Sequence, residues 1–236
     1  WKASGAIGYG DVRALAIGSS GYVYAGTPGM GVYRSTDNGK SWQTFGTLGL
    51  DNMDVRTIAL SSSAIFAGTR GGGIYKISNL GGKWAVSNNG LMNTFIYSLA
   101  SNASGQMFAG SGGAGIFRST DDGKTWEVVN TDLTNTYVTS LAINTSGYVF
   151  AATGNAGVFR STDNGAAWVD VNAWLTDPYI NALAIGRNGY VYAGTGGGSV
   201  YRSTDNGSFW TLVGTGTDAV LSLVSGPTGI LFAGTT

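Results

Sequence analysis

A tryptophan recurs at a nearly constant interval along the chain, and this recurrence constrains the fold more than any other feature. Five tryptophans follow one another at intervals of 42 residues, with one further tryptophan between the last two, and another stands 41 residues before the first of them. Six of the seven tryptophans therefore occupy one repeated position: Trp1, Trp42, Trp84, Trp126, Trp168 and Trp210. A fixed period of about 20 to 50 residues is typical of solenoids and propellers, so we expect copies of one small unit.

Each unit reads as a series of short strands. In the first copy, apolar runs fall at residues 12–17, 22–27 and 31–34, and a polar turn then leads to Trp42. The runs are rich in Val, Ile, Tyr and Phe, and turn-forming residues bound them, which predicts strands and no sustained helix. A sheet of four such strands has two apolar faces that copies of it can bury. The sequence therefore predicts an all-β fold, a β-propeller of about six four-stranded blades.

We expect one propeller domain over residues 1–236. Its repeats are 1–42, 43–84, 85–126, 127–168, 169–210 and a partial copy at 211–236. The partial copy supplies strands at Val220–Val224 and Ile230–Thr235, and the segment from Trp1 to Ser4 matches an outer strand that would close the sixth blade. The third strand of that blade has no sequence here. Either the chain belongs to a longer protein or another subunit fills the gap, because an open sheet edge favours self-association.

Composition excludes several classes of site. The chain has no His and no Cys, which removes Ser-His-Asp and Cys-His catalysis, disulfides and thiolate metal sites. Lys plus Arg and Asp plus Glu number 13 each, so no field of one sign attracts nucleic acid or an anionic membrane. No apolar run is long enough to span a bilayer. We therefore expect no metal, no nucleic acid partner and no membrane span.

A glycine-rich segment suggests a cofactor site only at first sight. Gly110–Gly115 fits the G-x-G-x-x-G fingerprint of dinucleotide sites. That fingerprint requires a helix after it, whereas a strand is expected here, as in every other copy. We therefore expect tight turns and no cofactor.

An octet with the pattern Ser-x-Asp-x-Gly-x-x-Trp recurs between the third and fourth strands. It occurs at Ser35–Trp42, Ser119–Trp126, Ser161–Trp168 and Ser203–Trp210, with a decayed copy at Ile77–Trp84. In a hairpin turn, Ser and Asp side chains cap backbone N–H groups, Gly adopts positive φ, and Trp packs against the sheet. The octet resembles the Asp-box (BNR) repeat of sialidase-like and related bacterial surface propellers, and four copies in register make the resemblance specific.

The resemblance implies that the octet residues are structural. Catalysis needs carboxylates that converge, whereas one carboxylate at the same place in each blade points outward around a rim. The residues concerned are Ser35, Asp37, Gly39, Trp42, Ser119, Asp121, Gly123, Trp126, Ser161, Asp163, Gly165, Trp168, Ser203, Asp205, Gly207 and Trp210. The same argument predicts local pairing or packing for the cations directly before each octet: Arg34, Lys76, Arg118, Arg160 and Arg202.

Positions that differ between copies are the candidates for a binding site. Just before the first apolar residue of each inner strand, the copies carry Asp11, Asp54, Phe95, Tyr137 and Tyr179. Two positions later stand Arg13 and Arg56, on the same side of their strands as the two aspartates. These charges form either local ion pairs or contacts with a polar ligand. We expect this column at one mouth of the propeller, on the face that carries the loops between second and third strands.

The seventh tryptophan, Trp174, stands outside the repeated series. Its counterparts in neighbouring copies are Gly90 and Asp132, so the scaffold requires no aromatic residue there. With Tyr179 and Tyr137 it provides either a platform for stacking a sugar ring or polymer, or packing between blades.

Three functions fit these features. The first is a non-catalytic extracellular module that binds a glycan or a protein partner through the loop face bearing Trp174 and Tyr179. The second is a structural protomer of a surface assembly or filament, completed by strand addition. The resemblance also implies a secreted or surface-attached protein, most simply a bacterial one.

The third function is a glycoside hydrolase of the Asp-box class. Two carboxylates would have to act as acid and base or nucleophile, and the candidates are Asp11, Asp54, Asp132 and Asp177. A sialidase-like site needs a Tyr/Glu pair, but the only glutamate, Glu127, directly follows a repeat tryptophan on an outer strand. The sequence therefore favours binding over hydrolysis.

Overall fold

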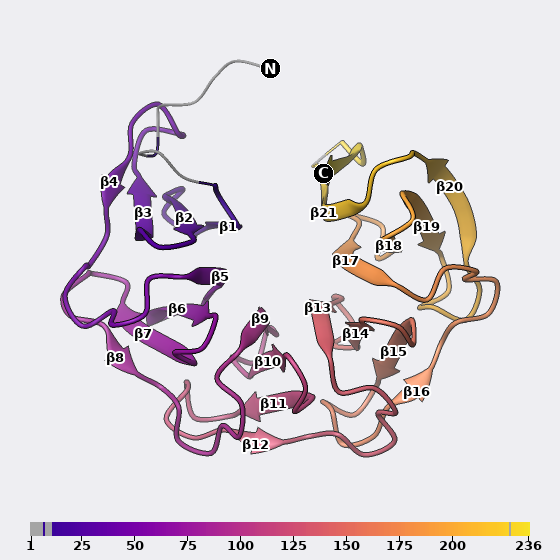
Figure 1. The fold of residues 1–236 in the computed structure, drawn as a ribbon, viewed down its shortest axis with the longest axis horizontal. Helices are drawn as coiled ribbons and strands as arrows, with labels where there is room; N and C mark the ends of the chain where they lie inside the picture. The colour runs from indigo at the N-terminus through magenta and orange to yellow at the C-terminus, as the bar shows by residue number, and fades with distance from the viewer. Residues whose placement is uncertain (1–6, 8–10, 227) are drawn as a thin grey trace. The chain divides into compact units, whose positions relative to one another are not determined.

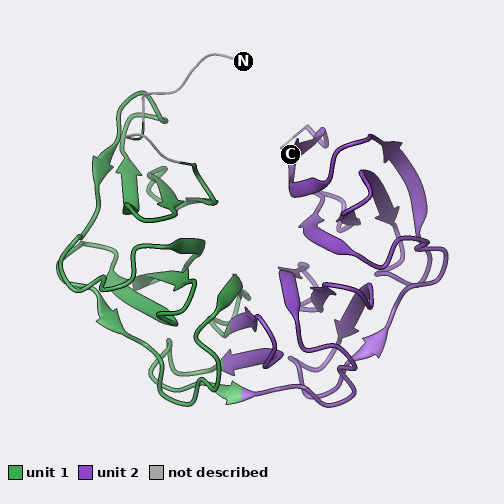
Figure 2. Ribbon diagram, viewed as in Figure 1, with its two compact units in different colours: residues 1–107, 119–127 green, residues 108–118, 128–236 purple. Residues whose placement is uncertain are grey.

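The computed structural model describes residue 7 and residues 11–226 and 228–236. The chain divides into two compact units, which are described separately (Figure 2). Unit 1 contains residues 1–107 and 119–127, and unit 2 contains residues 108–118 and 128–236. All regular structure in the described residues is β-strand, and no helix there is long and apolar enough to cross a membrane.

Unit 1 contains two complete four-stranded antiparallel sheets (Figure 1). The first is formed by β1 (Ala14–Ile17), β2 (Val23–Thr27), β3 (Gly31–Ser35) and β4 (Gln43–Thr44). The second is formed by β5 (Val55–Leu60), β6 (Ala64–Thr69), β7 (Ile74–Ser78) and β8 (Ala85–Val86). In both sheets each strand pairs with the next one along the chain.

A third four-stranded sheet contains the boundary between the units. It is formed by β9 (Ile96–Ser101), β10 (Met107–Ser111), β11 (Ile116–Ser119) and β12 (Glu127–Val128). Strand β9 belongs to unit 1, whereas most of β10 and β11 belongs to unit 2.

Unit 2 contains two further four-stranded sheets and one two-stranded sheet. The first four-stranded sheet is formed by β13 (Val138–Ile143), β14 (Val149–Thr153), β15 (Val158–Ser161) and β16 (Val169–Asp170). The second is formed by β17 (Ile180–Ile185), β18 (Val191–Thr195), β19 (Ser199–Ser203) and β20 (Thr211–Thr215). The last sheet holds only β21 (Val220–Ser225) and β22 (Leu231–Thr235). Five four-stranded sheets and a sixth, two-stranded one confirm the predicted all-β fold class and its number of sheets. The outer strand predicted from Trp1 to Ser4 lies outside the described residues.

The second strands of the sheets end in Ala-Gly-Thr or a close variant, and close packing between successive sheets explains the glycine. The first strands of neighbouring sheets lie side by side, β1 beside β5 in unit 1 and β17 beside β21 in unit 2. At Gly26 on β2, a Cβ atom would lie 2.6 Å from a methyl carbon of Val55 on β5, so a side chain there would clash unless Val55 moved. The hydroxyl of Thr27 is buried and donates a 3.0 Å hydrogen bond to the Gly31 carbonyl, which fixes the loop between β2 and β3.

The repeated tryptophans join each sheet to the preceding one within its unit. The rings of Trp84, Trp126, Trp168 and Trp210 are buried. Each indole N–H donates to a backbone carbonyl 39 residues earlier, just after the outer strand of the preceding repeat. The acceptors are Phe45, Ser87, Val129 and Val171. One residue type thereby supplies both apolar packing and a satisfied buried donor.

An asparagine after the outer strand fixes the loop between the second and third strands. In unit 2, the Asn130 side-chain oxygen accepts from the Ile116 N–H at 2.8 Å, and its amide nitrogen donates to the Ala114 carbonyl at 2.9 Å. Asn88 and Asn172 make the same pair of bonds in their own repeats. These loops, which form the predicted binding face, are therefore held in a defined conformation.

Candidate functional site

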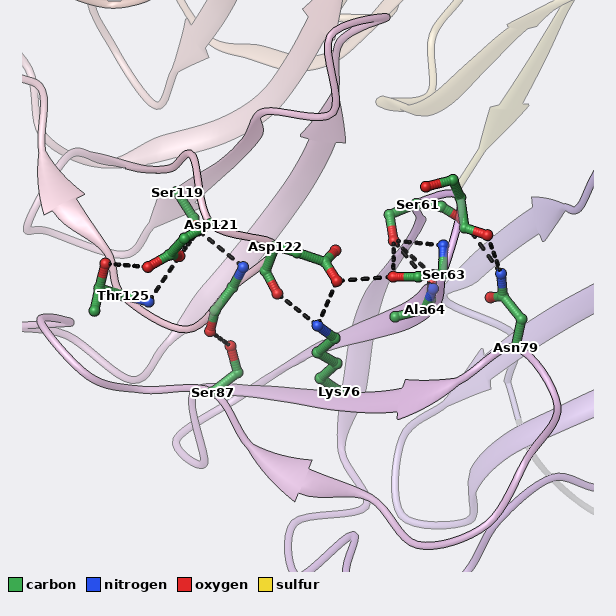
Figure 3. A network of polar contacts seen from close by, with 12 residues as sticks. Ser61, Ser63, Ala64, Lys76, Asn79, Ser87, Ser119, Asp121, Asp122 and Thr125 are labelled. Carbon is green, nitrogen blue, oxygen red and sulfur yellow. Dashed lines mark hydrogen bonds and ion pairs between the residues drawn. The ribbon is translucent and has the colours of Figure 1, made fainter.

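The octet turns are closed by their own side chains. In the third repeat, the Ser119 hydroxyl donates to Asp121 at 2.8 Å, and the Gly123 N–H donates to the Ser119 hydroxyl at 2.8 Å (Figure 3). The Thr125 N–H and hydroxyl both donate to Asp121, at 2.9 and 2.7 Å. These bonds from Thr125 hold the pKa of Asp121 down at about 2, so the carboxylate stays ionised and is committed to the turn.

The other three intact octets share this geometry. Their Ser-to-Asp bonds are Ser35–Asp37, Ser161–Asp163 and Ser203–Asp205. Each turn contains one non-glycine residue with φ close to 59°, namely Asn38, Asp122, Asn164 and Asn206. Asn and Asp tolerate this left-handed conformation better than other side chains, which explains the residue choice.

Three of the cations that precede an octet contact the octet turn of the following repeat. In unit 2, Arg118 and Arg160 donate to the carbonyls of Asn164 and Asn206, at 2.7 and 2.8 Å. In unit 1, Lys76 donates to the Asp122 carbonyl at 2.7 Å and to its carboxylate at 2.6 Å (Figure 3). These cations serve the packing of successive sheets within each unit.

The predicted binding column lies beside the loops between second and third strands. The Asp54 carbonyl accepts from the Arg70 N–H at 3.0 Å, at the start of such a loop in unit 1. In unit 2, the carbonyls of Tyr137 and Tyr179 accept from equivalent loop N–H groups at 3.0 and 2.8 Å. The side chains of Phe95, Tyr137 and Tyr179 are all exposed. The aromatic members of the column therefore lie on the surface of the unit to which each belongs.

Both predicted charge pairs are formed in the structure. Arg13 contacts Asp11 at 3.0 Å with both side chains exposed, whereas Arg56 contacts Asp54 at 2.8 Å with both partly buried. An exposed pair of this kind contributes less than about 1 kcal/mol. Each aspartate therefore pairs with the arginine two positions later, which fits the interpretation of these charges as local ion pairs.

Asp177, another candidate acid, is part of the scaffold. Its two carboxylate oxygens accept the N–H groups of Tyr179 and Gly197, each at 3.0 Å. Burial acts to raise the pKa of Asp177, but the bonds from the Thr195 hydroxyl and these two N–H groups outweigh it and hold the pKa below its ordinary value. A carboxyl group ionised in this way is unsuited to donate a proton. Within the described residues, no three acidic side chains gather into a metal-binding group.

Trp174 occupies an unusual backbone position on the surface of unit 2. Its φ is 68° and its side chain is 72% exposed. The same position is Gly49, Gly90 or Asp132 in other repeats, all with positive φ. The backbone at this position therefore favours glycine, and a bulky aromatic side chain there is a genuine outlier.

The structure pairs Trp174 with Phe209, a residue that the sequence reasoning did not select. The two ring centroids lie 5.8 Å apart at 49°, and Phe209 is 47% exposed. Phe209 belongs to the last octet turn, and the neighbouring Ala173 carbonyl accepts the Trp210 N–H at 3.2 Å. The ring contact of Trp174 is thus made at the octet turn, and its grouping with Tyr179 and Tyr137 stays a prediction.

A signal for Phe209 was present in the sequence. The equivalent octet position is small or polar in every other copy: Ser41, Lys83, Thr125 and Ala167. Trp174 and Phe209 are therefore both exceptions to the repeat. They stand at two different repeat positions, and nothing in the sequence indicates that these positions are in contact.

Comparisons with known proteins agree with this geometry. The family model for the BNR/Asp-box repeat matches residues 33–44 and 117–128, two of the octets described above. A structure of the extracellular domain of a B. thetaiotaomicron protein assigned as a one component system is similar over 96% of this chain and 32% of its own, with 21% identity and a TM-score of 0.77. The chain is a β-propeller with BNR/Asp-box repeats.

Other solved propellers share the fold and differ in activity. The GH74 xyloglucanase from Xanthomonas campestris is similar over 99% of this chain and 43% of its own, with 21% identity and a TM-score of 0.75. Virginiamycin B lyase from Staphylococcus aureus is similar over 94% of this chain and 76% of its own, with 15% identity and a TM-score of 0.77. At these identities the likeness shows the fold alone, and the chain spans about a third of the first structures it matches. A comparison with curated protein sequences finds no match.

Proposed function

We propose that this protein is a non-catalytic extracellular module that binds a glycan, with the ring pair of Trp174 and Phe209 as the surface on which a sugar stacks. The observation that carries the proposal is the pair itself, since two aromatic exceptions to the repeat lie side by side on the surface. Extracellular domains among the structural neighbours support the location.

The conformation of Trp174 supports a role outside folding. A non-glycine residue in the left-handed region costs on the order of 1–3 kcal/mol, and an exposed indole gains little by burial. Trp174 therefore stabilises the fold less than glycine would at the same position. An aromatic ring with this exposure provides a flat apolar surface for a ligand.

The chemistry around the ring pair suits a neutral, hydroxyl-rich ligand. Ser208, next to Phe209 in the octet turn, is polar, uncharged and exposed, and its hydroxyl donates to the Asp205 carbonyl at 3.1 Å. The chain has no net formal charge, so neither sign of ligand is attracted at long range. One structural neighbour, the xyloglucanase, is an enzyme that acts on a glycan, which supports glycans as the first class to test.

The carboxylates support binding without hydrolysis. Asp11 and Asp54 are paired with arginines, and Asp177 is held by backbone N–H groups. Hydrolysis of a glycosidic bond needs one carboxyl group poised to donate a proton. None of these three is arranged for that task.

A glycan array tests the proposal. The wild type is compared with Trp174→Gly and Phe209→Ser, which restore residues used elsewhere in the repeat, and with Leu80→Ala as a control that removes an exposed apolar side chain in unit 1. We expect the wild type and the control to retain the same glycans, and both ring-pair variants to lose about tenfold or more in affinity.

Three results would overturn it. The wild type could retain no glycan, the ring-pair variants could bind as well as the wild type, or the bound glycan could be cleaved with release of reducing ends. A protein partner captured through the same rings, with no glycan retained, would assign the surface to protein recognition instead.

A further inference from the structure

A cavity opens between the first two sheets of unit 1. Its volume is about 230 Å³, and Tyr22 and Tyr24 line it from the first repeat while Leu60 and Asn79 line it from the second. Both sheets have all four strands, and the described lining residues all fall within positions 18–80. The cavity is therefore built from two complete sheets of one unit.

At the equivalent place in other repeats, polar side chains meet across the interface. One repeat later in unit 1, the Asp122 carboxylate accepts from the Lys76 amine at 2.6 Å and from the Ser63 hydroxyl at 2.8 Å (Figure 3). In unit 2, the Asn144 amide nitrogen donates to the Asn206 side-chain oxygen at 2.9 Å. These side chains close the interfaces at this end of their sheets.

The first interface lacks both kinds of side chain. Gly18 stands at the position of Asn144. Leu80 stands at the position of Asp122 and Asn206. Those two residues have a φ of 59°, whereas Leu80 is not among the described residues with positive φ, and its side chain is 96% exposed. The space that polar side chains occupy in the other interfaces therefore remains open in this one.

The cation of the first repeat is also placed differently. Arg34 corresponds to Lys76, which bonds to the octet turn of the following repeat. The Arg34 guanidinium instead lies over the rings of Tyr22 and Phe45, 5.4 and 4.8 Å from their centroids. Among the described residues that line the cavity, none is charged. The cavity therefore suits a neutral ligand, because a charged one would lose hydration without meeting an opposite charge there.

Two polar groups of the lining are available to a ligand. Tyr24 is 4% exposed, and burial raises its pKa while the nearby Arg34 opposes this only in part, so the phenol keeps its proton at neutral pH. Within the part of the chain that the structure describes, this proton has no acceptor. The Asn79 amide nitrogen donates to the Ser62 carbonyl at 2.9 Å, which leaves its side-chain oxygen as an acceptor. A ligand hydroxyl can accept from the first group or donate to the second.

The other walls favour an aromatic ring. They are the rings of Tyr22 and Tyr24 and the side chain of Leu60, and the Ser61 hydroxyl already accepts from the Ala64 N–H at 3.0 Å. A cavity of about 150 Å³ holds a benzene ring, so this one accommodates a ring with a polar substituent. A hexose fits less well, because several of its hydroxyls would be buried without partners.

We propose that this cavity binds a small neutral phenol, with its ring against Tyr22, Tyr24 and Leu60 and its hydroxyl bonded to the Tyr24 hydroxyl. The lining residues Ser19, Ser20 and Leu80 are exposed, so a ligand can enter from solvent. The proposed glycan site uses residues of unit 2, and this inference does not depend on it.

A titration of the full chain with 4-fluorophenol, followed by fluorine NMR, tests the inference. We expect saturable binding to one site. Fluorobenzene, which lacks the hydroxyl, should bind several-fold more weakly, and 4-fluorobenzoate, which carries a charge, at least tenfold more weakly. Glucose should not displace 4-fluorophenol.

Tyr24→Phe removes only the hydroxyl and introduces the residue that the second repeat carries as Phe66. It should weaken 4-fluorophenol binding several-fold and leave fluorobenzene binding unchanged, which also shows that the cavity is intact. The matched control is Tyr192→Phe, at the same position of the fifth repeat, and it should bind both probes as the wild type does.

Gly18→Asn introduces the side chain that Asn144 supplies in the fourth repeat. A Cβ atom at Gly18 would lie 3.6 Å from its nearest neighbour, so the backbone accepts the substitution. The new side chain should occupy the cavity and weaken 4-fluorophenol binding at least tenfold.

Four results would overturn the inference. They are the absence of saturable 4-fluorophenol binding, binding of 4-fluorobenzoate as tight as that of 4-fluorophenol, displacement by glucose, and an unchanged 4-fluorophenol affinity in either Tyr24→Phe or Gly18→Asn.

Discussion

Trp168 and Trp174 are the same residue type six positions apart in one unit, and their environments are opposite. Trp168 is 1% exposed and donates its indole N–H to the Val129 carbonyl at 2.7 Å. Trp174 is 72% exposed, has a φ of 68° and contacts Phe209 on the surface. The first recurs in the repeat and the second does not. Recurrence therefore marks residues that hold the sheets together, and we propose that the exceptions mark the binding surface.

The octet turns show the same division. The decayed copy at Ile77–Trp84 lacks the Ser and Asp side chains, yet Trp84 remains buried and bonded to the Phe45 carbonyl. Asn79, in the place of the aspartate, donates instead to the Ser62 carbonyl at 2.9 Å (Figure 3). The buried ring of Trp84 is thus kept even though the Ser and Asp bonds that close the other octet turns are absent from this one.

The largest expected effect is that of Trp168→Ala. Truncating a fully buried indole leaves a cavity and an unpaired Val129 carbonyl, so we expect a loss of about 3–5 kcal/mol in the free energy of unfolding. Denaturant unfolding measures it. A loss below about 1 kcal/mol would show that the repeated tryptophans do not hold the sheets together.

The next effect is that of Asp121→Ala, which removes the carboxylate that closes an octet turn. We expect a loss of about 1 kcal/mol, as for removal of a helix N-cap, because the side chain is close to solvent and its bonds are screened. The folded-state pKa of Asp121, about 2, lies below the ordinary value of 3.8, so its stabilisation is full above pH 4 and is lost as the pH falls through 2.

Unfolding at several pH values checks this dependence. The matched control is Asn79→Ala, at the same turn position without a carboxylate, and its effect should not change with pH. An Asp121→Ala effect that stays constant from pH 5 to about pH 2 would contradict the account.

A smaller effect is expected at the contact between Lys76 and Asp122. Burial acts to raise the pKa of Asp122, but bonds from Lys76 and Ser63 outweigh it and hold the pKa below its ordinary value. Because both side chains are partly exposed, a double-mutant cycle of Lys76→Met and Asp122→Asn should give a coupling of about 0.5–1 kcal/mol that weakens at high salt. A coupling that salt does not alter would indicate that charge is not its source.

The smallest effect on stability, and one of opposite sign, is expected for Trp174→Gly. Glycine relieves the left-handed backbone, so stability should be unchanged or increase by up to about 1 kcal/mol. Trp174→Ala keeps the unfavourable conformation and should gain less. A loss of more than about 1 kcal/mol in the glycine variant would show that Trp174 belongs to the scaffold after all.

The fold could be predicted from the sequence because the same pattern of residues recurs about every 42 positions. Repeated tryptophans and alternating short apolar runs predict the sheets, and the missing third strand of the sixth repeat is visible as a two-stranded sheet. Local bonds were harder to predict: Asn88, Asn130 and Asn172 also recur every 42 residues, but only the structure shows which loop each side chain holds.

The candidate site was only partly accessible. Trp174 could be selected because it differs from the residues at the same position in other repeats. Its contact with Phe209 could not be predicted, because it depends on how the chain passes from one sheet to the next. Phe209 was overlooked as a binding residue because it lies inside an octet whose residues were predicted to have a structural role in the turn. The role of Asp177 was missed because its bonds to Gly197 join residues 20 positions apart.

The most direct test measures stability and glycan affinity together for two variants, Trp168→Phe and Trp174→Gly, against a glycan retained by the wild type. The account predicts that Trp168→Phe loses stability but, where folded, keeps the wild-type affinity, whereas Trp174→Gly keeps its stability and loses about tenfold or more in affinity. Equal loss of affinity in both variants, or loss of stability only in Trp174→Gly, would contradict it.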